Sequence, residues 1–181
     1  MEKIAICAIF KDEAPYLLEW IAFHRMIGVD LFVLYDNGSS DGGAELVRQS
    51  GFARNVTILD WSDRPGQLSA YRHFHATYAD AFTWVAFIDI DEFIVPVGTG
   101  SIRGILLREA YKPYADILLN WQIFGPSGHA ARPNGLVIAT PASRCCNDHL
   151  SPASVLRRHG DQSLLHEIGR GVGFQAPARA W

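Results

Sequence analysis

Residues 84–96 read Trp-Val-Ala-Phe-Ile-Asp-Ile-Asp-Glu-Phe-Ile-Val-Pro, and the expected fold follows from this stretch. The run Trp84–Ile88 is apolar without alternation, which predicts a strand covered on both faces, as in a parallel sheet. Three carboxylates follow, Asp89, Asp91 and Glu92. Such groups are costly to desolvate unless a positive charge meets them, and Mg²⁺ and Mn²⁺ prefer oxygen ligands. The stretch predicts a divalent metal site at the ligand-binding edge of an α/β sheet, and the alternative is a solvated turn with exposed acids.

Composition limits the classes of protein that fit. The chain has 181 residues, 49% of them apolar, which predicts one domain with a sizeable core. The net charge of −3 gives no basic excess, so we expect no nucleic-acid partner. Cys7, Cys145 and Cys146 offer neither a disulfide framework nor zinc-binding spacing, which favours a reducing cytoplasm. The N-terminus is not typical of a signal peptide, and no apolar run reaches the roughly 18 residues of a membrane span, so membrane contact would be peripheral.

The first half of the chain alternates apolar runs with helical patterns. Apolar runs predict three strands before the central one, over Ile4–Phe10, Leu31–Tyr35 and Val56–Leu59. Helical spacing predicts helices over residues 17–26, 44–49 and 67–80, with Asp12 or Glu13 capping the first and Ser40 or Asp41 the second. Strands alternating with helices define an α/β layer architecture with a mostly parallel sheet and helices on both faces.

The second half is less regular. The patterns predict a helix over residues 101–111, strands over 116–124 and 136–139, and a weak helix over 155–168. Arginine, glycine and proline are scattered through the residues after 144 without clear periodicity. We therefore expect a domain over residues 1–144 and a loosely packed tail over residues 145–181.

Polar residues at the predicted strand ends are candidates for ligand binding. Asp36 directly follows the second strand and opens a run of turn formers that extends to Gly43, so its carboxylate can meet a nucleoside. An ordinary strand-to-helix turn is the alternative. On the helix over residues 67–80, Arg72, His73 and His75 can face a diphosphate, or can form a solvated polar face.

Several segments together carry a family resemblance. They are Ile9–Trp20 with His24 and Gly28, Tyr35–Asp41, Gln67 with Ala70, Tyr71 and His73, Trp84 with Phe87–Phe93, and Trp121 with Phe124–Gly128. In this order they resemble family 2-like glycosyltransferases of the GT-A fold, most of all the family 92 branch. The resemblance covers about residues 1–144, and nothing beyond Arg144 takes part in it.

This resemblance implies transfer of a sugar from a nucleotide-sugar donor, commonly a UDP-sugar, to a glycan or another hydroxyl acceptor. Asp89-Ile90-Asp91 would be the DXD motif. Asp91 would ligate Mn²⁺ or Mg²⁺ at the donor diphosphate, and Asp89 would contact the ribose or the metal with its water shell. Asp36 would bind the nucleoside with Glu13 beside it, and Gln67 lies in a matching segment. Arg72, a candidate from its place on the helix over residues 67–80, completes the expected donor site.

An inverting transferase, the expected type, also needs a carboxylate that takes the proton of the acceptor hydroxyl. The resemblance implies that this base lies well downstream of the acidic motif, where Asp148 and Glu167 are the candidates. It also implies that a downstream histidine, His129, His149 or His166, can complete the metal site. Two other functions stay open: a sugar-phosphate nucleotidyltransferase, which the acidic Lys11–Glu13 loop disfavours, and a nucleotide-sugar-binding module without turnover.

Overall fold

A computed structural model describes residues 3–98, 100–111, 113–114, 116–120, 124, 135–139 and 152–158. The strands are β1 (Ile4–Phe10), β2 (Leu31–Asp36), β3 (Val56–Asp60), β4 (Trp84–Phe87), β5 (Asp116–Asn120) and β6 (Pro152–Arg158). The α-helices are α1 (Ala14–Met26), α2 (Gly43–Gln49), α3 (Gln67–Tyr78) and α4 (Ile102–Leu106). The four strands and three helices predicted for the first half are confirmed.

The described strands form one sheet in the order β3-β2-β1-β4-β6-β5. The first four strands are parallel, whereas β6 runs antiparallel to both of its neighbours. Phe10 of β1 lies level with Asp36, and Asp36 lies level with Asp60 of β3. Because Phe87 of β4 pairs with Cys7, the residues after β4 leave the sheet at the same carboxyl edge.

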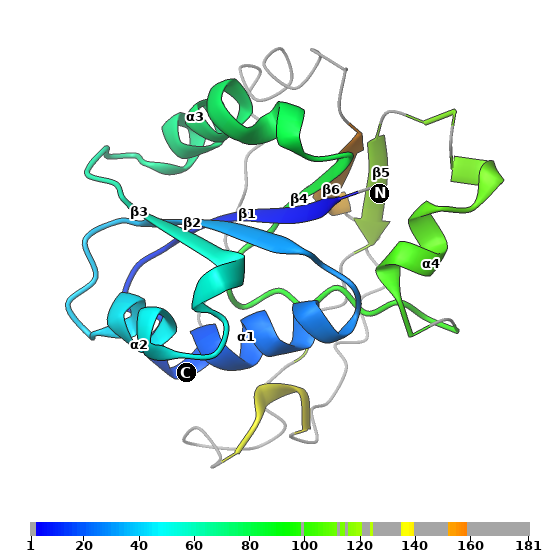
Figure 1. Cartoon of the computed structure of the whole chain (residues 1–181). Coiled ribbons are helices and arrows are strands. Elements are labelled where there is room, and N and C mark those ends of the chain that lie inside the picture. The colour runs from blue at the N-terminus through cyan, green and yellow to red at the C-terminus, as the bar shows by residue number, and fades with distance from the viewer. Residues whose placement is uncertain are drawn as a thin grey trace.

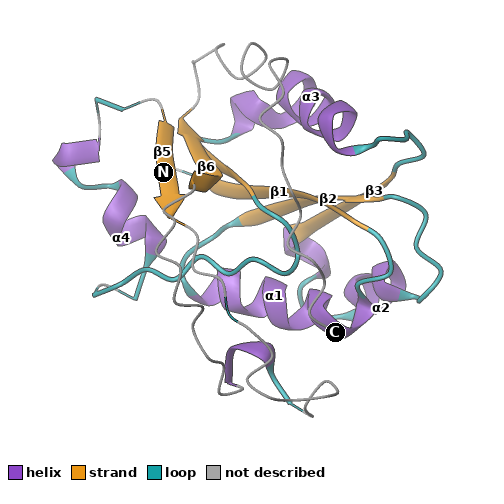
Figure 2. Ribbon diagram, turned by 180° about the vertical axis from the view of Figure 1, so that it is seen from behind, coloured by secondary structure: helices purple, strands orange, loops and turns teal. Residues whose placement is uncertain are grey.

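Both faces of this sheet are covered, which explains the apolar runs without alternation. Figure 1 shows α3 on one side of the sheet and α1 with α2 on the other, and Figure 2 shows the same layers from behind. On β1, Ile4 and Ile6 pack into the core on the side of α1, whereas Ala5 and Cys7 pack on the side of α3. Cys7 is a buried free thiol, as expected for a small apolar residue in a central strand. The expected α/β fold, a mostly parallel sheet with helices on both faces, is confirmed.

One carboxylate, Asp41, joins the starts of two helices. It accepts hydrogen bonds from the backbone N–H of Ala14 at 2.7 Å and from that of Gly43 at 3.0 Å. The N-cap residue of α2 is Gly42 rather than the predicted Ser40 or Asp41, but the Asp41 carboxylate accepts from the first N–H of this helix. The first N–H of α1 donates to the same distant residue. Glu13 is the N-cap residue of α1 and makes no side-chain cap hydrogen bond.

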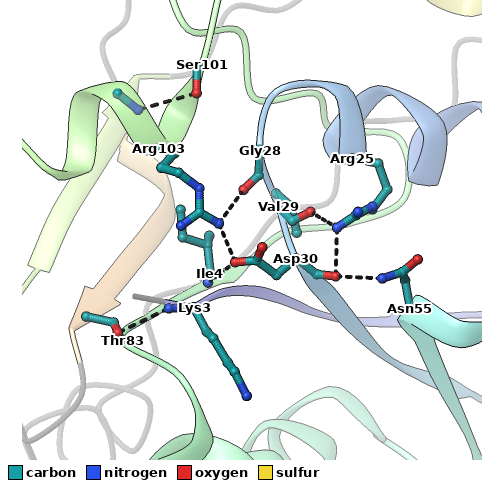
Figure 3. A network of polar contacts seen from close by, with 11 residues as sticks. Lys3, Ile4, Arg25, Gly28, Val29, Asp30, Asn55, Thr83, Ser101 and Arg103 are labelled. Carbon is teal, nitrogen blue, oxygen red and sulfur yellow. Dashed lines mark hydrogen bonds and ion pairs between the residues drawn. The ribbon is translucent and has the colours of Figure 1, made fainter. Parts of the chain in front are cut away.

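A second polar network lies at the amino ends of the parallel strands (Figure 3). The carboxylate of Asp30 accepts from the backbone N–H of Ile4 at 2.9 Å and forms an ion pair with Arg103 of α4. Arg25 of α1 donates to the backbone oxygens of Val29 and Asp30. This network fixes the turn into β2 and docks α4 beside it.

The later elements differ from their predictions. The helix expected over residues 101–111 is split into α4 and a 3₁₀ turn, Glu109–Tyr111. The strand expected over residues 116–124 is confirmed for β5, which ends at Asn120. The strand expected over residues 136–139 is wrong, because Val137–Ala139 form a 3₁₀ turn. The carboxylate of Glu19 accepts from the N–H groups of Val137 and Ile138, at 2.9 and 3.0 Å, and so satisfies donors that a strand would have paired.

The helix expected over residues 155–168 is wrong for the part that the structure describes. Residues 152–158 form β6, which lies between β4 and β5. Within the ranges given above, no helix is long and apolar enough to cross a membrane.

Candidate functional site

The acidic segment after β4 forms a tight turn over Asp89–Glu92. The backbone N–H of Glu92 donates to the Asp89 carbonyl at 3.1 Å, and the Glu92 carboxylate accepts from the Asp89 N–H at 3.1 Å. Glu92 therefore closes the turn with both its backbone and its side chain. The two aspartates are left at the edge of the sheet, where the sequence predicted them.

Apolar residues alternate with the acids and anchor this turn. Ile88, Ile90 and Ile94 are buried in the core on the side of α1. Asp89 is partly buried and Asp91 is exposed. Burial, together with the nearby Asp91 carboxylate, raises the pKa of Asp89. Two acids held close together, one of them partly desolvated, are an arrangement that a bound cation would stabilise.

Gln67, the first residue of α3, reaches the turn from the other side of the sheet. Its Nε2 donates to Asp89 Oδ1 at 3.3 Å and to the Tyr71 hydroxyl at 3.2 Å. Tyr71 is buried one helical turn later, so the amide is held between a fixed phenol and the acid. The structure thus brings together Gln67 and Asp89, two residues predicted to bind the donor.

Asp36 lies at the end of β2, two strands from β4 across β1. The strand spacing puts these positions about 10 Å apart. Its side chain is almost buried, and its Oδ1 accepts from the Ser39 N–H at 2.8 Å. Asp36 and Asp89 can therefore contact different parts of one extended ligand that lies along the sheet edge.

Asp12 supports the loop after β2, a role that sequence reasoning missed. It has a positive φ of 55°, and its carboxylate accepts from the Ser40 N–H at 2.7 Å. Its own N–H donates to Ser39 Oγ at 3.0 Å. The hydrogen bond from the Ser40 backbone is the main reason that the pKa of Asp12 is lowered. These hydrogen bonds join the loop after β1 to the loop after β2. Glu13, the next residue after Asp12, is the N-cap of α1.

The basic residues of α3 do not gather at the acids. Arg72 is exposed. It lies five positions after Gln67, and at about 100° per residue it points from another side of the helix. His73 accepts from or donates to the Tyr35 hydroxyl at 2.9 Å and packs against Trp61, so its ring faces the sheet rather than the acidic turn. His75 is partly exposed.

Other predicted site residues lie outside the described residues: the candidate bases Asp148 and Glu167, and the possible metal ligands His129, His149 and His166. Within the described ranges, no group of three or more His, Cys, Asp or Glu side chains is arranged to hold a metal ion. Asp89 and Asp91 alone still suit Mg²⁺ or Mn²⁺, because such ions commonly bind through one or two carboxylates together with substrate phosphates and water.

Two residues of α1 that carried no predicted role contact the segment after the acids. The indole Nε1 of Trp20 donates to the Glu92 carbonyl at 2.8 Å. The Ile94 N–H donates to His24 Nε2 at 3.2 Å, and His24 Nδ1 is 2.8 Å from the Trp20 carbonyl. Both side chains are fully buried. Both lie in or beside a segment that carries the family resemblance, and their spacing of four residues, which places them on one side of α1, was the available signal.

Comparison with known proteins relates this architecture to one family. The model described as Glycosyltransferase family 92 matches residues 2–125. A glycosyltransferase family 92 protein of Oryza sativa subsp. japonica is 33% identical over 133 residues, which cover 72% of this chain and 23% of that protein. Another, from Arabidopsis thaliana, is 27% identical over 177 residues, covering 92% of this chain and 31% of that protein. The chain thus spans less than a third of the length of these relatives.

A solved structure shares the fold. The crystal structure of S. aureus TarS 1–349 matches with a TM-score of 0.56 at 15% identity, over 92% of this chain and 49% of that chain. TarS 1–349 in complex with UDP matches with a TM-score of 0.53. At this identity the likeness concerns the fold alone.

Proposed function

The chain belongs to glycosyltransferase family 92, and from this membership we infer that it transfers a sugar from a nucleotide-sugar donor to a hydroxyl acceptor. We propose UDP as the nucleotide and Mn²⁺ or Mg²⁺ as the cofactor. The observation that carries the proposal is the pair Asp89 and Asp91, presented on a closed turn at the carboxyl edge of the sheet. Ligands bind at this edge in open α/β sheets.

Each described residue has a distinct part in the proposed site. Asp91, which is exposed, would ligate the ion, and Asp89 would bind the ion, its water or the ribose. The bound ion would offset the negative charge of the leaving diphosphate. Gln67 holds Asp89 Oδ1, so the acid keeps one orientation.

Asp36 would accept hydrogen bonds from the nucleoside with Oδ2, since Oδ1 already serves the Ser39 N–H. Glu13 and Arg72 stay candidate donor contacts. The base for an inverting transfer stays assigned to Asp148 or Glu167. The UDP complex of TarS, a protein with the same fold, supports UDP as the first nucleotide to test.

The direct test is UDP binding to the whole chain by calorimetry, in Mn²⁺ and in EDTA. We expect Mn²⁺ to strengthen binding and Asp91→Asn to remove that gain, by at least about tenfold in affinity. Glu45→Gln, which changes an exposed acid on α2, is the matched control and should bind like the wild type. Equal UDP affinity with Mn²⁺ and with EDTA would refute the metal-dependent site.

The nucleoside contact is tested with a second ligand. Asp36→Ala should weaken UDP far more than inorganic pyrophosphate, which has no nucleoside. Asp36→Asn keeps an acceptor for the Ser39 N–H. This variant therefore distinguishes a disturbed loop structure from a lost contact with the nucleoside. Equal weakening of both ligands would mean that Asp36 acts through the fold.

A further inference from the structure

Helix α1 holds the acidic turn through its exit segment, residues 92–94. The Trp20 indole contacts the Glu92 carbonyl, and the His24 imidazole accepts from the Ile94 N–H two residues later. Trp20 and His24 are four positions apart, so they lie one above the other on the same side of α1. Two hydrogen bonds from one rigid helix therefore fix both the position and the direction of this short segment.

Ring packing strengthens the same contact. Phe93 lies edge-on to Phe23 of α1, with ring centroids 5.3 Å apart, and stacks on His24 at 5.9 Å. Trp20 packs against His24 at 4.7 Å. Phe23 and Phe93 are partly buried, and Trp20 and His24 are fully buried. Because protein interiors are closely packed, the segment cannot shift along α1 without losing these ring contacts.

Glu92 transmits this constraint to the proposed metal ligands. Its carbonyl accepts from Trp20, its N–H donates to the Asp89 carbonyl, and its carboxylate accepts from the Asp89 N–H. A displacement of Glu92 therefore displaces the backbone of Asp89. Since Asp89 and Asp91 lie on the same closed turn, their separation depends on where α1 holds Glu92.

We propose that Trp20 and His24 are positioning residues, which set the geometry of the Asp89–Glu92 turn for metal-dependent donor binding. This inference rests on the function proposed above. Residues that orient metal ligands without touching the metal typically change metal affinity by about 10–100-fold when they are replaced. An ordinary core role would predict only a loss of stability.

The test measures UDP affinity of the whole chain in Mn²⁺ and in EDTA, alongside the melting temperature. Trp20→Phe removes the indole N–H and keeps an aromatic ring, and His24→Leu removes the acceptor for Ile94. Both should lower the Mn²⁺-dependent affinity about 10–100-fold and leave the affinity in EDTA unchanged. His24→Gln, whose amide oxygen can replace Nε2 as acceptor, should recover part of the loss.

Ile21→Val is the matched control. Ile21 is buried in the same core and lies on the same helix between the two positioning residues, and the substitution keeps both hydrogen bonds. It should lower the melting temperature without changing the gain in affinity from Mn²⁺. If His24→Leu does not fold, Trp20→Phe still provides the test.

Three outcomes would overturn the inference: unchanged Mn²⁺-dependent affinity in Trp20→Phe, an equal loss in Ile21→Val, or no recovery in a folded His24→Gln relative to His24→Leu. A wild-type chain that binds UDP equally in Mn²⁺ and EDTA would refute the proposed function itself, before any variant is compared.

Discussion

The neutral state of His24 makes the stability of the fold depend on pH. His24 is fully buried on α1. Its Nδ1 lies 2.8 Å from the Trp20 carbonyl, which can only accept, so Nδ1 carries the proton and donates. Its Nε2 faces the Ile94 N–H at 3.2 Å and must accept. A second proton on the ring would place two donors against each other in the core, so the folded protein excludes it.

The size of the effect follows from the displaced pKa. Burial lowers the pKa of His24 from 6.5 to about 4, against a smaller opposing effect of the Trp20 carbonyl. Between these values the unfolded chain binds a proton that the folded protein does not, so the free energy of unfolding falls as the pH falls. The full difference corresponds to about 3 kcal/mol, and about 2 kcal/mol is already lost at pH 5. Above pH 6.5 the effect disappears.

Urea unfolding of the wild type and of His24→Gln, at several pH values between 7.5 and 4.5, isolates this contribution. Carboxylates titrate in both proteins and cancel in the difference. We expect the wild type to lose about 2 kcal/mol more than the variant between pH 7.5 and pH 5. His75→Gln removes a partly exposed imidazole from α3 and controls for the loss of a histidine as such. Parallel profiles for the wild type and His24→Gln would refute the reasoning.

Two further predictions concern the loops at the carboxyl edge. Gly66→Ala should destabilise the fold by about 1–3 kcal/mol in urea unfolding, because a Cβ would lie 2.8 Å from the Asp63 carbonyl and 2.9 Å from Ile9 Cδ1. Gly51→Ala, which has no atom within 4 Å of the added carbon, should show no such loss. Asp41→Ala removes the acceptor for the N-termini of two helices and should lower the free energy of unfolding by about 1–2 kcal/mol, whereas Asp41→Asn, which keeps one acceptor oxygen, should lose less.

Local pattern predicted the elements of the first half, where each strand and helix has its own signal within a short window of sequence. The strands β1, β2 and β4 are largely buried on both faces, whereas β3 is an outer strand and only partly buried. Each has an apolar run that identifies it without knowledge of the partner strands. The placement of Asp36 and Asp89 at the carboxyl ends of their strands was predictable for a related reason, since Asp36 ends β2 and Asp89 closely follows β4. The family resemblance named Gln67 as a donor-binding candidate, but its contact with Asp89 is seen only in the structure.

The failures arise where a distant residue decides the local structure. The apolar residues 136–139 resemble a strand, but the Glu19 carboxylate takes two of their backbone donors and leaves a 3₁₀ turn. Residues 155–158 belong to β6 because β4 and β5 offer open edges on either side of it. Neither interaction can be predicted from a short window of sequence, because the partner residues are far away in the chain. The role of His24 was missed for the same reason, since its acceptor nitrogen serves Ile94, 70 positions away.

The Asp89–Glu92 turn depends on contacts from residues that are far away in the sequence. Asp89 and Asp91 repel each other, and the partial burial of Asp89 adds a desolvation cost, so a free loop would relax by moving both acids into water. Three contacts oppose this relaxation: Gln67 from α3, Trp20 from α1, and Glu92 within the turn itself. The two helices lie on opposite faces of the sheet (Figure 1). The turn is therefore held by both layers, and a shift of either helix changes the distance between the acids. An ion bound at the proposed site would have to accept the separation of Asp89 and Asp91 that the two helices impose, and such rigid support of the ligands would favour an ion of suitable size and charge.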